Sequence, residues 1–192
     1  MSNPTGNRLA VLALLLAVLS GCGQGHLPQG PLGAWPENHD TVGQPVLRGG
    51  ADTIGFDGFY NGGTKPAVID RVVIVSPRHI KLHGAYVTIG GIIGNWTSFP
   101  PAIPAHGNPE SRLWATRHKA AGAVIPPHQQ AGLALGLSAT AAHGSLARTD
   151  VYYHVGNTHY EWRGNVRIVL TSVDCRAPSN KSARSFCRAY GP

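Results

Sequence analysis

Histidine is the residue of this chain whose abundance could support chemistry, because ten histidines are present and imidazole nitrogen is a common ligand for zinc and copper. His154 and His159 flank Gly156-Asn157, which favours a two-residue hairpin turn and would place the two rings opposite each other. His79 and His83 lie on one side of an extended segment. Neither pair is followed at a fixed spacing by a third ligand. We therefore expect solvated histidines and no metal site, with handling of zinc or copper(II) as the alternative function.

Catalytic motifs are not found in the sequence. Met1 is the single methionine, which disfavours a soft copper(I) site. Gly62-Gly63 and Gly90-Gly91 lack the lysine of a phosphate-binding loop, and the residues after Ser138 lack the final glycine of a hydrolase nucleophile turn. Acidic residues are few and widely separated. We expect a protein that is not an enzyme, with no catalytic residue and no cofactor.

Net charge indicates which partners the protein attracts. The chain has 16 Lys and Arg against 9 Asp and Glu, a formal charge of +7, which favours anionic surfaces such as phospholipid headgroups and acidic wall polymers. The basic residues lack the dense stripe, interleaved with aromatic residues, of a nucleic-acid-binding protein. A local excess follows Asp174, where the chain carries Arg176, Lys181, Arg184 and Arg188. We expect an envelope protein or a wall polymer as partner, and no nucleic acid.

The N-terminus combines an apolar run with a cysteine that follows small residues. Residues 9–19 are uninterruptedly apolar, a length typical of a signal-peptide core and too short to span a bilayer. Residues 19–22 read Leu-Ser-Gly-Cys and resemble the lipobox of bacterial lipoproteins. The resemblance implies cleavage between Gly21 and Cys22, diacylglycerol on the Cys22 thiol and a further acyl group such as palmitate, which together anchor a chain in membrane lipid. We predict a signal peptide over 1–21 and a location on the extracytoplasmic face of the cell membrane.

Composition divides the remaining chain into three regions. Residues 22–50 contain Gly and Pro every few positions with no helical or strand period, which predicts a flexible linker behind the lipidated cysteine. Residues 51–174 are expected to form one folded domain. Residues 175–192 are predicted to form a basic C-terminal tail. Within the tail we expect a disulfide between Cys175 and Cys187, because disulfides persist in exported proteins.

Short apolar runs separated by turn signals predict an all-β domain. The chain is 42% hydrophobic and 13% charged, with 25 Gly and 15 Pro, which excludes a helical bundle. About seven strands predict an immunoglobulin-like antiparallel β-sandwich, without the Cys-Trp-Cys core of true immunoglobulin domains. Leu133, Leu135 and Leu137 alternate with small residues, which predicts a half-buried strand, and no amphipathic helix is expected. Strands are predicted over 53–60, 67–75, 79–89, 133–138, 147–155 and 158–171, with one more short strand between 115 and 128.

The last two runs predict a hairpin in a specific register. Glycine at the first turn position suits a type II′ turn over 156–157. One face of the hairpin would then be apolar and aromatic and the other polar, and a slip of one residue would scramble both faces. The predicted pairs are Val155 with Thr158, Tyr153 with Tyr160 and Val151 with Trp162 on the apolar face, and His154 with His159, Tyr152 with Glu161 and Asp150 with Arg163 on the polar face.

Several phrases of the sequence resemble a known group of proteins. Segments 61–72, 84–87 and 122–127, together with the lipobox, are similar to uncharacterised secreted lipoproteins of actinobacteria with a β-sandwich domain. The resemblance covers about residues 55–170 and implies an exported β-sandwich with no established activity. No functional residue is therefore carried over.

These features together predict a membrane-anchored lipoprotein that acts as a non-enzymatic binding or accessory module at the cell envelope. Its expected contact surface is the loop over 90–112, which is rich in Gly and Pro. Trp96, Phe99 and the neighbouring Trp114 would provide aromatic anchors for a partner.

Overall fold

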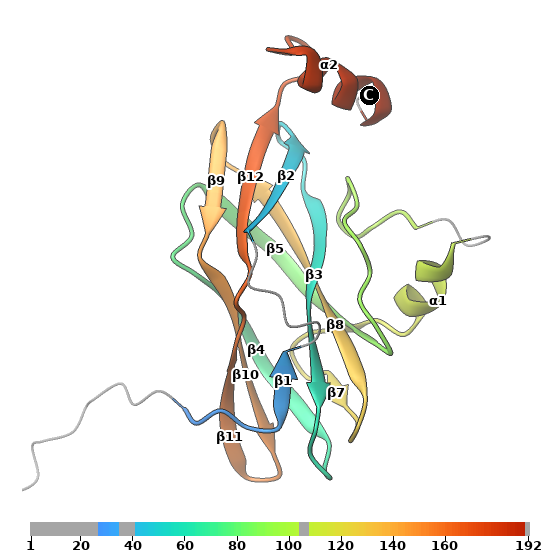
Figure 1. Cartoon of the computed structure of the whole chain (residues 1–192), viewed down its shortest axis with the longest axis vertical. Coiled ribbons are helices and arrows are strands. Elements are labelled where there is room, and N and C mark those ends of the chain that lie inside the picture. Colours follow the sequence, from blue (N-terminus) through green and yellow to red (C-terminus); the bar gives the residue numbers. More distant parts are fainter. Residues whose placement is uncertain (1–26, 35–40, 104–107, 191–192) are drawn as a thin grey trace, which may run out of the picture.

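The structure, a computed structural model, describes residues 27–34, 41–103 and 108–190. In these ranges the chain is mostly antiparallel β-sheet with two short peripheral helices (Figure 1), so the predicted all-β class is confirmed. Neither of these helices has the length and apolar character needed to cross a lipid bilayer. The strands are β1 (Leu32–Ala34), β2 (Thr41–Leu47), β3 (Asp52–Asn61), β4 (Ala67–Val75), β5 (Ile80–Ile89), β6 (His118–Lys119), β7 (Val124–Ile125), β8 (Gln130–Ala139), β9 (His143–Leu146), β10 (Arg148–Val155), β11 (Thr158–Arg163) and β12 (Arg167–Val173), and the helices are α1 (Pro109–Ala115) and α2 (Lys181–Tyr190).

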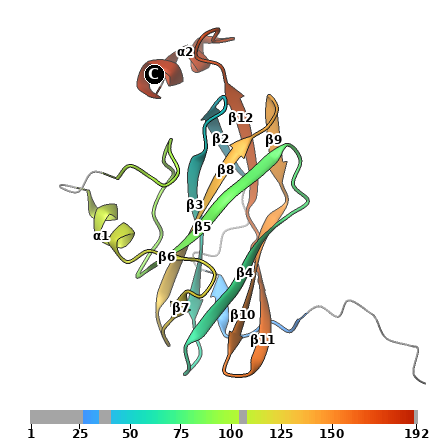
Figure 2. The same cartoon turned by 180° about the vertical axis from the view of Figure 1, so that it is seen from behind.

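Three sheets enclose one hydrophobic core. One layer is the five-stranded sheet β1-β3-β8-β5-β6. The other layer contains the four-stranded sheet β11-β10-β4-β7 and the three-stranded sheet β2-β12-β9. Figures 1 and 2 show an elongated immunoglobulin-like sandwich, with α2 at one end and the β10–β11 hairpin at the other. The largest fully buried side chains include Ile54, Phe59, Ile69, Leu135, Tyr153 and Leu170.

The prediction of a flexible linker over 22–50 is wrong for the described part of that range. β1 pairs antiparallel with β3, and β2 pairs parallel with the last strand, β12. Val46 of β2 is fully buried in the core. Pro45 beside it lacks an amide donor, which is tolerated because β2 is the edge strand of its sheet. The folded domain therefore begins before residue 51.

The predicted strand over 158–171 is in fact two strands in different sheets, β11 and β12. Between them the Gly164 amide donates to the Thr149 carbonyl at 2.7 Å. A Cβ on Gly164 would lie 2.7 Å from the same oxygen, so glycine is needed where the chain crosses between sheets. The described residues therefore contain twelve strands instead of about seven. The additional strands come from this division, from the unpredicted strands β1, β2 and β9, and from the two-residue strands β6 and β7.

β8 is buried on both faces, in contrast to the half-buried strand that its alternation predicts. Leu133, Leu135 and Leu137 lie in the core. On the other face, a Cβ on Gly132 would lie 2.4 Å from the Gly91 carbonyl oxygen, and a Cβ on Gly136 would lie 2.4 Å from the Phe99 ring. Small residues on this face therefore let the chain between β5 and β6 lie directly against the sheet.

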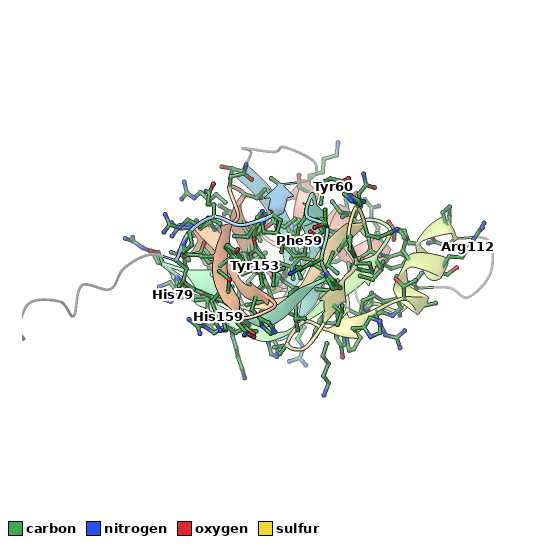
Figure 3. All side chains as sticks on the ribbon, turned by 90° about the horizontal axis from the view of Figure 1, so that it is seen from below. Phe59, Tyr60, His79, Arg112, Tyr153 and His159 are labelled. Atoms are coloured by element: carbon green, nitrogen blue, oxygen red, sulfur yellow. A yellow bond between two sulfur atoms is a disulfide. The ribbon has the colours of Figure 1, made fainter. Side chains whose placement is uncertain are left out.

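The predicted hairpin register is confirmed in all six pairs. Gly156 has φ 58°, as the first position of a type II′ turn requires. Val151 and Trp162 are buried on the inner face. Figure 3, viewed from below Figure 1, places Phe59 and Tyr153 between the layers and His159 at the periphery.

The predicted disulfide between Cys175 and Cys187 is confirmed, with 5.3 Å between the Cα atoms. Lys181–Tyr190 of the expected tail form the amphipathic helix α2, whose Ala183 is buried. The expectation of no amphipathic helix is therefore wrong. The missed signal is Asn180, whose side chain accepts a hydrogen bond from the Ala183 amide at 2.8 Å and so caps the helix start.

Candidate metal-binding site

The polar side of the β10–β11 hairpin forms the outer surface of its sheet. Because Val151 and Tyr153 point into the core, the alternate residues of β10, including His154, point outward. β4 lies beside β10 in this sheet and adds Asp70 to the same surface. Two strands of the hairpin and one distant strand of the sequence therefore build a shared polar face.

A β-bulge in β4 directs Asp70 toward this face. Ile69 pairs with Tyr153 and Arg71 pairs with Tyr152, so Asp70 is an extra residue with no pairing partner on β10. Neighbouring residues on a regular strand face opposite sides, but here both Asp70 and Arg71 are exposed while Ile69 stays in the core. A regular alternation would not place these two neighbours on one face, which is why the sequence pattern did not reveal Asp70 as a companion of the histidines.

Asp70 lies between the two histidines. Its Oδ1 is 2.7 Å from His154 Nδ1, and its Oδ2 is 3.2 Å from His159 Nδ1. The two imidazole centroids are 5.5 Å apart, and the ligand atoms of the three residues all lie within 4.8 Å of one another. The side chain of His159 is 60% exposed, and those of His154 and Asp70 are 32% and 31% exposed. The cluster is therefore open to solvent but rests on strands that the core holds in place.

These donors suit a divalent transition-metal ion. Imidazole nitrogen and carboxylate oxygen are the usual ligands of zinc and copper(II). Around a tetrahedral ion with bonds of about 2.0–2.1 Å, two ligand atoms lie about 3.3 Å apart. The two carboxylate–imidazole separations are 2.7 and 3.2 Å, and the three ligand atoms lie within 4.8 Å of one another, so they would have to move by up to about 1.5 Å to surround one ion. Asp70, which no fixed spacing in the sequence indicates, is therefore the candidate third ligand beside the two histidines.

Charged residues farther along the hairpin are already paired. Arg148 donates to both oxygens of Asp150 at 2.8 and 3.1 Å, and Arg163 donates to Glu161 at 3.0 Å. Each ion pair thus runs along one strand, although Asp150 and Arg163 are cross-strand neighbours as predicted. Asp150 and Glu161 are each 3% exposed, so their arginines offset the cost of burying the carboxylates. We interpret this row as structural.

The predicted aromatic contact surface is packed onto the protein. Trp114 in α1 is only 9% exposed, so the prediction that it is an exposed anchor is wrong. Trp96 and Phe99 are half-buried. Trp96 Nε1 donates to Glu110 at 2.8 Å, and the other oxygen of Glu110 accepts from the Gly94 amide at 2.9 Å. These residues fasten the loop to α1 and to the outer face of β8.

The other predicted site residues are not brought into this cluster. His79 precedes β5 with φ 53°, and His83 Nε2 lies 2.8 Å from Ser138 Oγ. Among the residues that the structure describes, no third ligand joins these two histidines. Gly21 and Cys22, the predicted cleavage and lipidation residues, lie outside the described ranges.

Two carboxyl groups of β3 are buried inside the sandwich. Asp52 is fully buried and Asp57 is 7% exposed. Burial raises the pKa of Asp57 to about 7 and the pKa of Asp52 to about 6. The nearby Gln44 side chain acts against burial at Asp52 and lowers its pKa. Both oxygens of Asp52 and Oδ2 of Asp57 have no hydrogen-bond partner among the described residues. These carboxyl groups therefore oppose folding when they are ionised.

Comparisons with known proteins find only distant similarity of fold. No protein-family model matches the sequence, and no curated protein matches it significantly. Among solved structures, the chain is similar to PapD-like domain 7 of human CEP192, an ASH/PapD-like domain, with 10% identity and a TM-score of 0.37 over 79% of this chain and 92% of that one. It is also similar to the Vibrio cholerae VesB protease, with 7% identity and a TM-score of 0.37 over 74% of this chain and 32% of that one. At these scores neither similarity bears on activity.

Proposed function

We propose that this protein is a lipid-anchored domain on the extracytoplasmic face of the cell membrane that binds a divalent transition-metal ion at Asp70, His154 and His159. The position of Asp70 carries the metal assignment, because its carboxylate lies within 2.7 and 3.2 Å of two imidazole nitrogens. Such a ligand set suits zinc or copper(II). Lipid attachment at Cys22 is supported by the Leu-Ser-Gly-Cys sequence behind the apolar run.

The proposed role is binding of the ion, not catalysis. The cluster lies on an exposed sheet surface, with the His159 side chain 60% exposed. Three protein ligands leave at least one coordination position for water or for a group of a partner protein. This site replaces the loop over 90–112 as the main candidate contact, since Trp114 is buried. An envelope protein or an anionic wall polymer is the proposed further partner of this binding or accessory module.

Calorimetric titration of the mature protein in detergent with Zn²⁺ and, separately, Cu²⁺ tests the metal site. We expect one ion per chain and an affinity at least tenfold lower in Asp70→Asn and His154→Ala, because each variant removes a ligand. His118→Ala is the matched control, since His118 is also an exposed strand histidine. Binding should weaken as the pH falls, because protons compete for the imidazole nitrogens. Equal affinity of Asp70→Asn and the wild type for both ions would refute the site.

The lipid anchor is tested separately with Cys22→Ser. We expect this variant to incorporate no labelled palmitate and to move from the membrane fraction to the soluble fraction, because the acyl chains supply the anchoring free energy. If the variant remains tightly bound to membranes, the anchor is not at Cys22.

A further inference from the structure

The first described residues are attached to one end of the sandwich. The Glu161 amide donates to the Pro28 carbonyl at 3.1 Å, and the Gly62 amide donates to the Pro31 carbonyl at 2.9 Å. The Leu32 amide donates to the Tyr153 hydroxyl at 3.1 Å, and the Leu32 side chain is buried. The chain is therefore held by the domain almost from residue 28 onward.

This attachment lies at the end of the molecule opposite α2. Figures 1 and 2 both place β1 and the segment before it beside the β10–β11 turn, with α2 at the far end. The turn after β3 and the turn before β8 lie at the same end of the molecule. They are joined to each other, because the Asn61 amide donates to the Gln129 carbonyl at 3.0 Å and the Asn61 carbonyl accepts from the His128 amide at 2.8 Å. We name this surface, formed by residues 62–66, 126–129 and 156–157, the hairpin end.

Covalent geometry limits how far the hairpin end can lie from a lipid on Cys22. Four residues lie between Cys22 and Leu27, so five residue-to-residue steps join them, and a fully extended chain spans at most about 3.5 Å per step, or about 17 Å in total. A ten-residue strand such as β3 is about 33 Å long. The reach is thus only about half the length of a single strand of the sandwich.

We propose that the hairpin end faces the membrane and contacts phospholipid headgroups, while α2 faces away from it. This inference rests on the proposed lipid attachment at Cys22. The three turns of the hairpin end contain Lys65 and His128 and no carboxylate, a composition compatible with an anionic lipid surface. The ends of β10 and β11 that carry His154 and His159 adjoin the same turn, so the proposed metal site lies close to the membrane.

Energy transfer from single labels to acceptor lipids tests the orientation. Asn157→Cys places a fluorophore on the hairpin turn. Ala142→Cys places a matched one near α2, because exposed Ala142 lines the same hollow of about 530 Å³ as Ala183 and Phe186 of α2. The lipidated protein is bound to vesicles of phosphatidylcholine and phosphatidylglycerol that contain a headgroup acceptor. We expect transfer several-fold higher from position 157 than from position 142.

A spacer variant tests whether the short connection causes this difference. A flexible Gly/Ser spacer of about 30 residues inserted between Gly25 and His26 lengthens the reach, so the transfer from the two positions should become similar. Equal or reversed transfer in the original protein, with normal co-sedimentation on vesicles, would overturn the orientation alone. Absence of both co-sedimentation and transfer would overturn the lipid attachment and, with it, the orientation.

Discussion

The buried carboxyl group of Asp57 makes the sandwich less stable as the pH rises, and Asp57→Asn should remove this effect. The folded-state pKa of about 7 lies above the ordinary value of 3.8. A group whose pKa is raised on folding contributes stability that is present below pH 3.8 and lost as the pH rises through about 7. Asparagine has nearly the same shape and does not ionise, so it mimics the protonated acid at every pH.

The magnitude follows from the difference between these two pKa values. At 1.36 kcal/mol per pH unit, a pKa raised from 3.8 to about 7 corresponds to about 4 kcal/mol between the protonated and ionised forms. We therefore expect the unfolding free energy of Asp57→Asn to exceed that of the wild type by about 1 kcal/mol at pH 4.5 and by about 4 kcal/mol at pH 8. Asp52, whose pKa burial raises to about 6, should leave a smaller dependence of the same sign in the variant.

Urea denaturation at pH 4.5, 6 and 8 measures these unfolding free energies, with the slope of each transition as a check that unfolding stays two-state. Asp174→Asn is the control, because Asp174 forms a surface ion pair with Arg48 at 3.0 Å. Its unfolding free energy should change by less than about 1 kcal/mol. A constant difference between Asp57→Asn and the wild type from pH 4.5 to 8 would show that the carboxyl group is not buried as described.

Three further predictions concern the packing of the domain. Replacing Cys175 and Cys187 with serine should raise amide exchange across α2 and remove about 2–3 kcal/mol of local stability, and simultaneous loss of protection in the sheets would contradict a local role. Gly136→Val should destabilise the domain by about 1–3 kcal/mol and expose the loop over 90–112 to protease, because the new side chain collides with Phe99. The control Gly43→Ala places its methyl group in open space and should leave that loop resistant to protease. A chain that starts at residue 48 should fail to fold as a monomer, because it lacks β1 and β2. A chain that starts at residue 27 retains both strands and should fold. Circular dichroism and size-exclusion chromatography distinguish these outcomes.

The parts of the fold that sequence predicts well are those governed by local rules. β4 occupies the predicted residues 67–75, because its β-branched run has turn residues on both sides. The register of β10 and β11 follows from one turn type and from the alternation of apolar and polar residues. The disulfide agrees with the pairing that the sequence predicted from the proposed export and from the number of cysteines.

The parts that sequence did not predict depend on contacts between distant segments. Asp70 joins His154 and His159 only through a bulge in β4, and a bulge leaves no signal in a period-two pattern. β2 was predicted as linker because it contains Gly and Pro, and its pairing partner β12 lies far away in the sequence. The burial of Trp114 depends on the small residues of β8, whose outer face it helps to cover.

The parallel pairing of β2 with β12 also determines when the domain can finish folding. β2 begins at Thr41, and its pairing partners extend from Arg167 to Val173. Until residues 167–173 have been released, Val46 has no sheet in which to be buried, and closure of this long loop must precede the pairing. A chain exported as proposed would therefore pass through its membrane channel without the completed sandwich, and the final strand would close the fold on the far side.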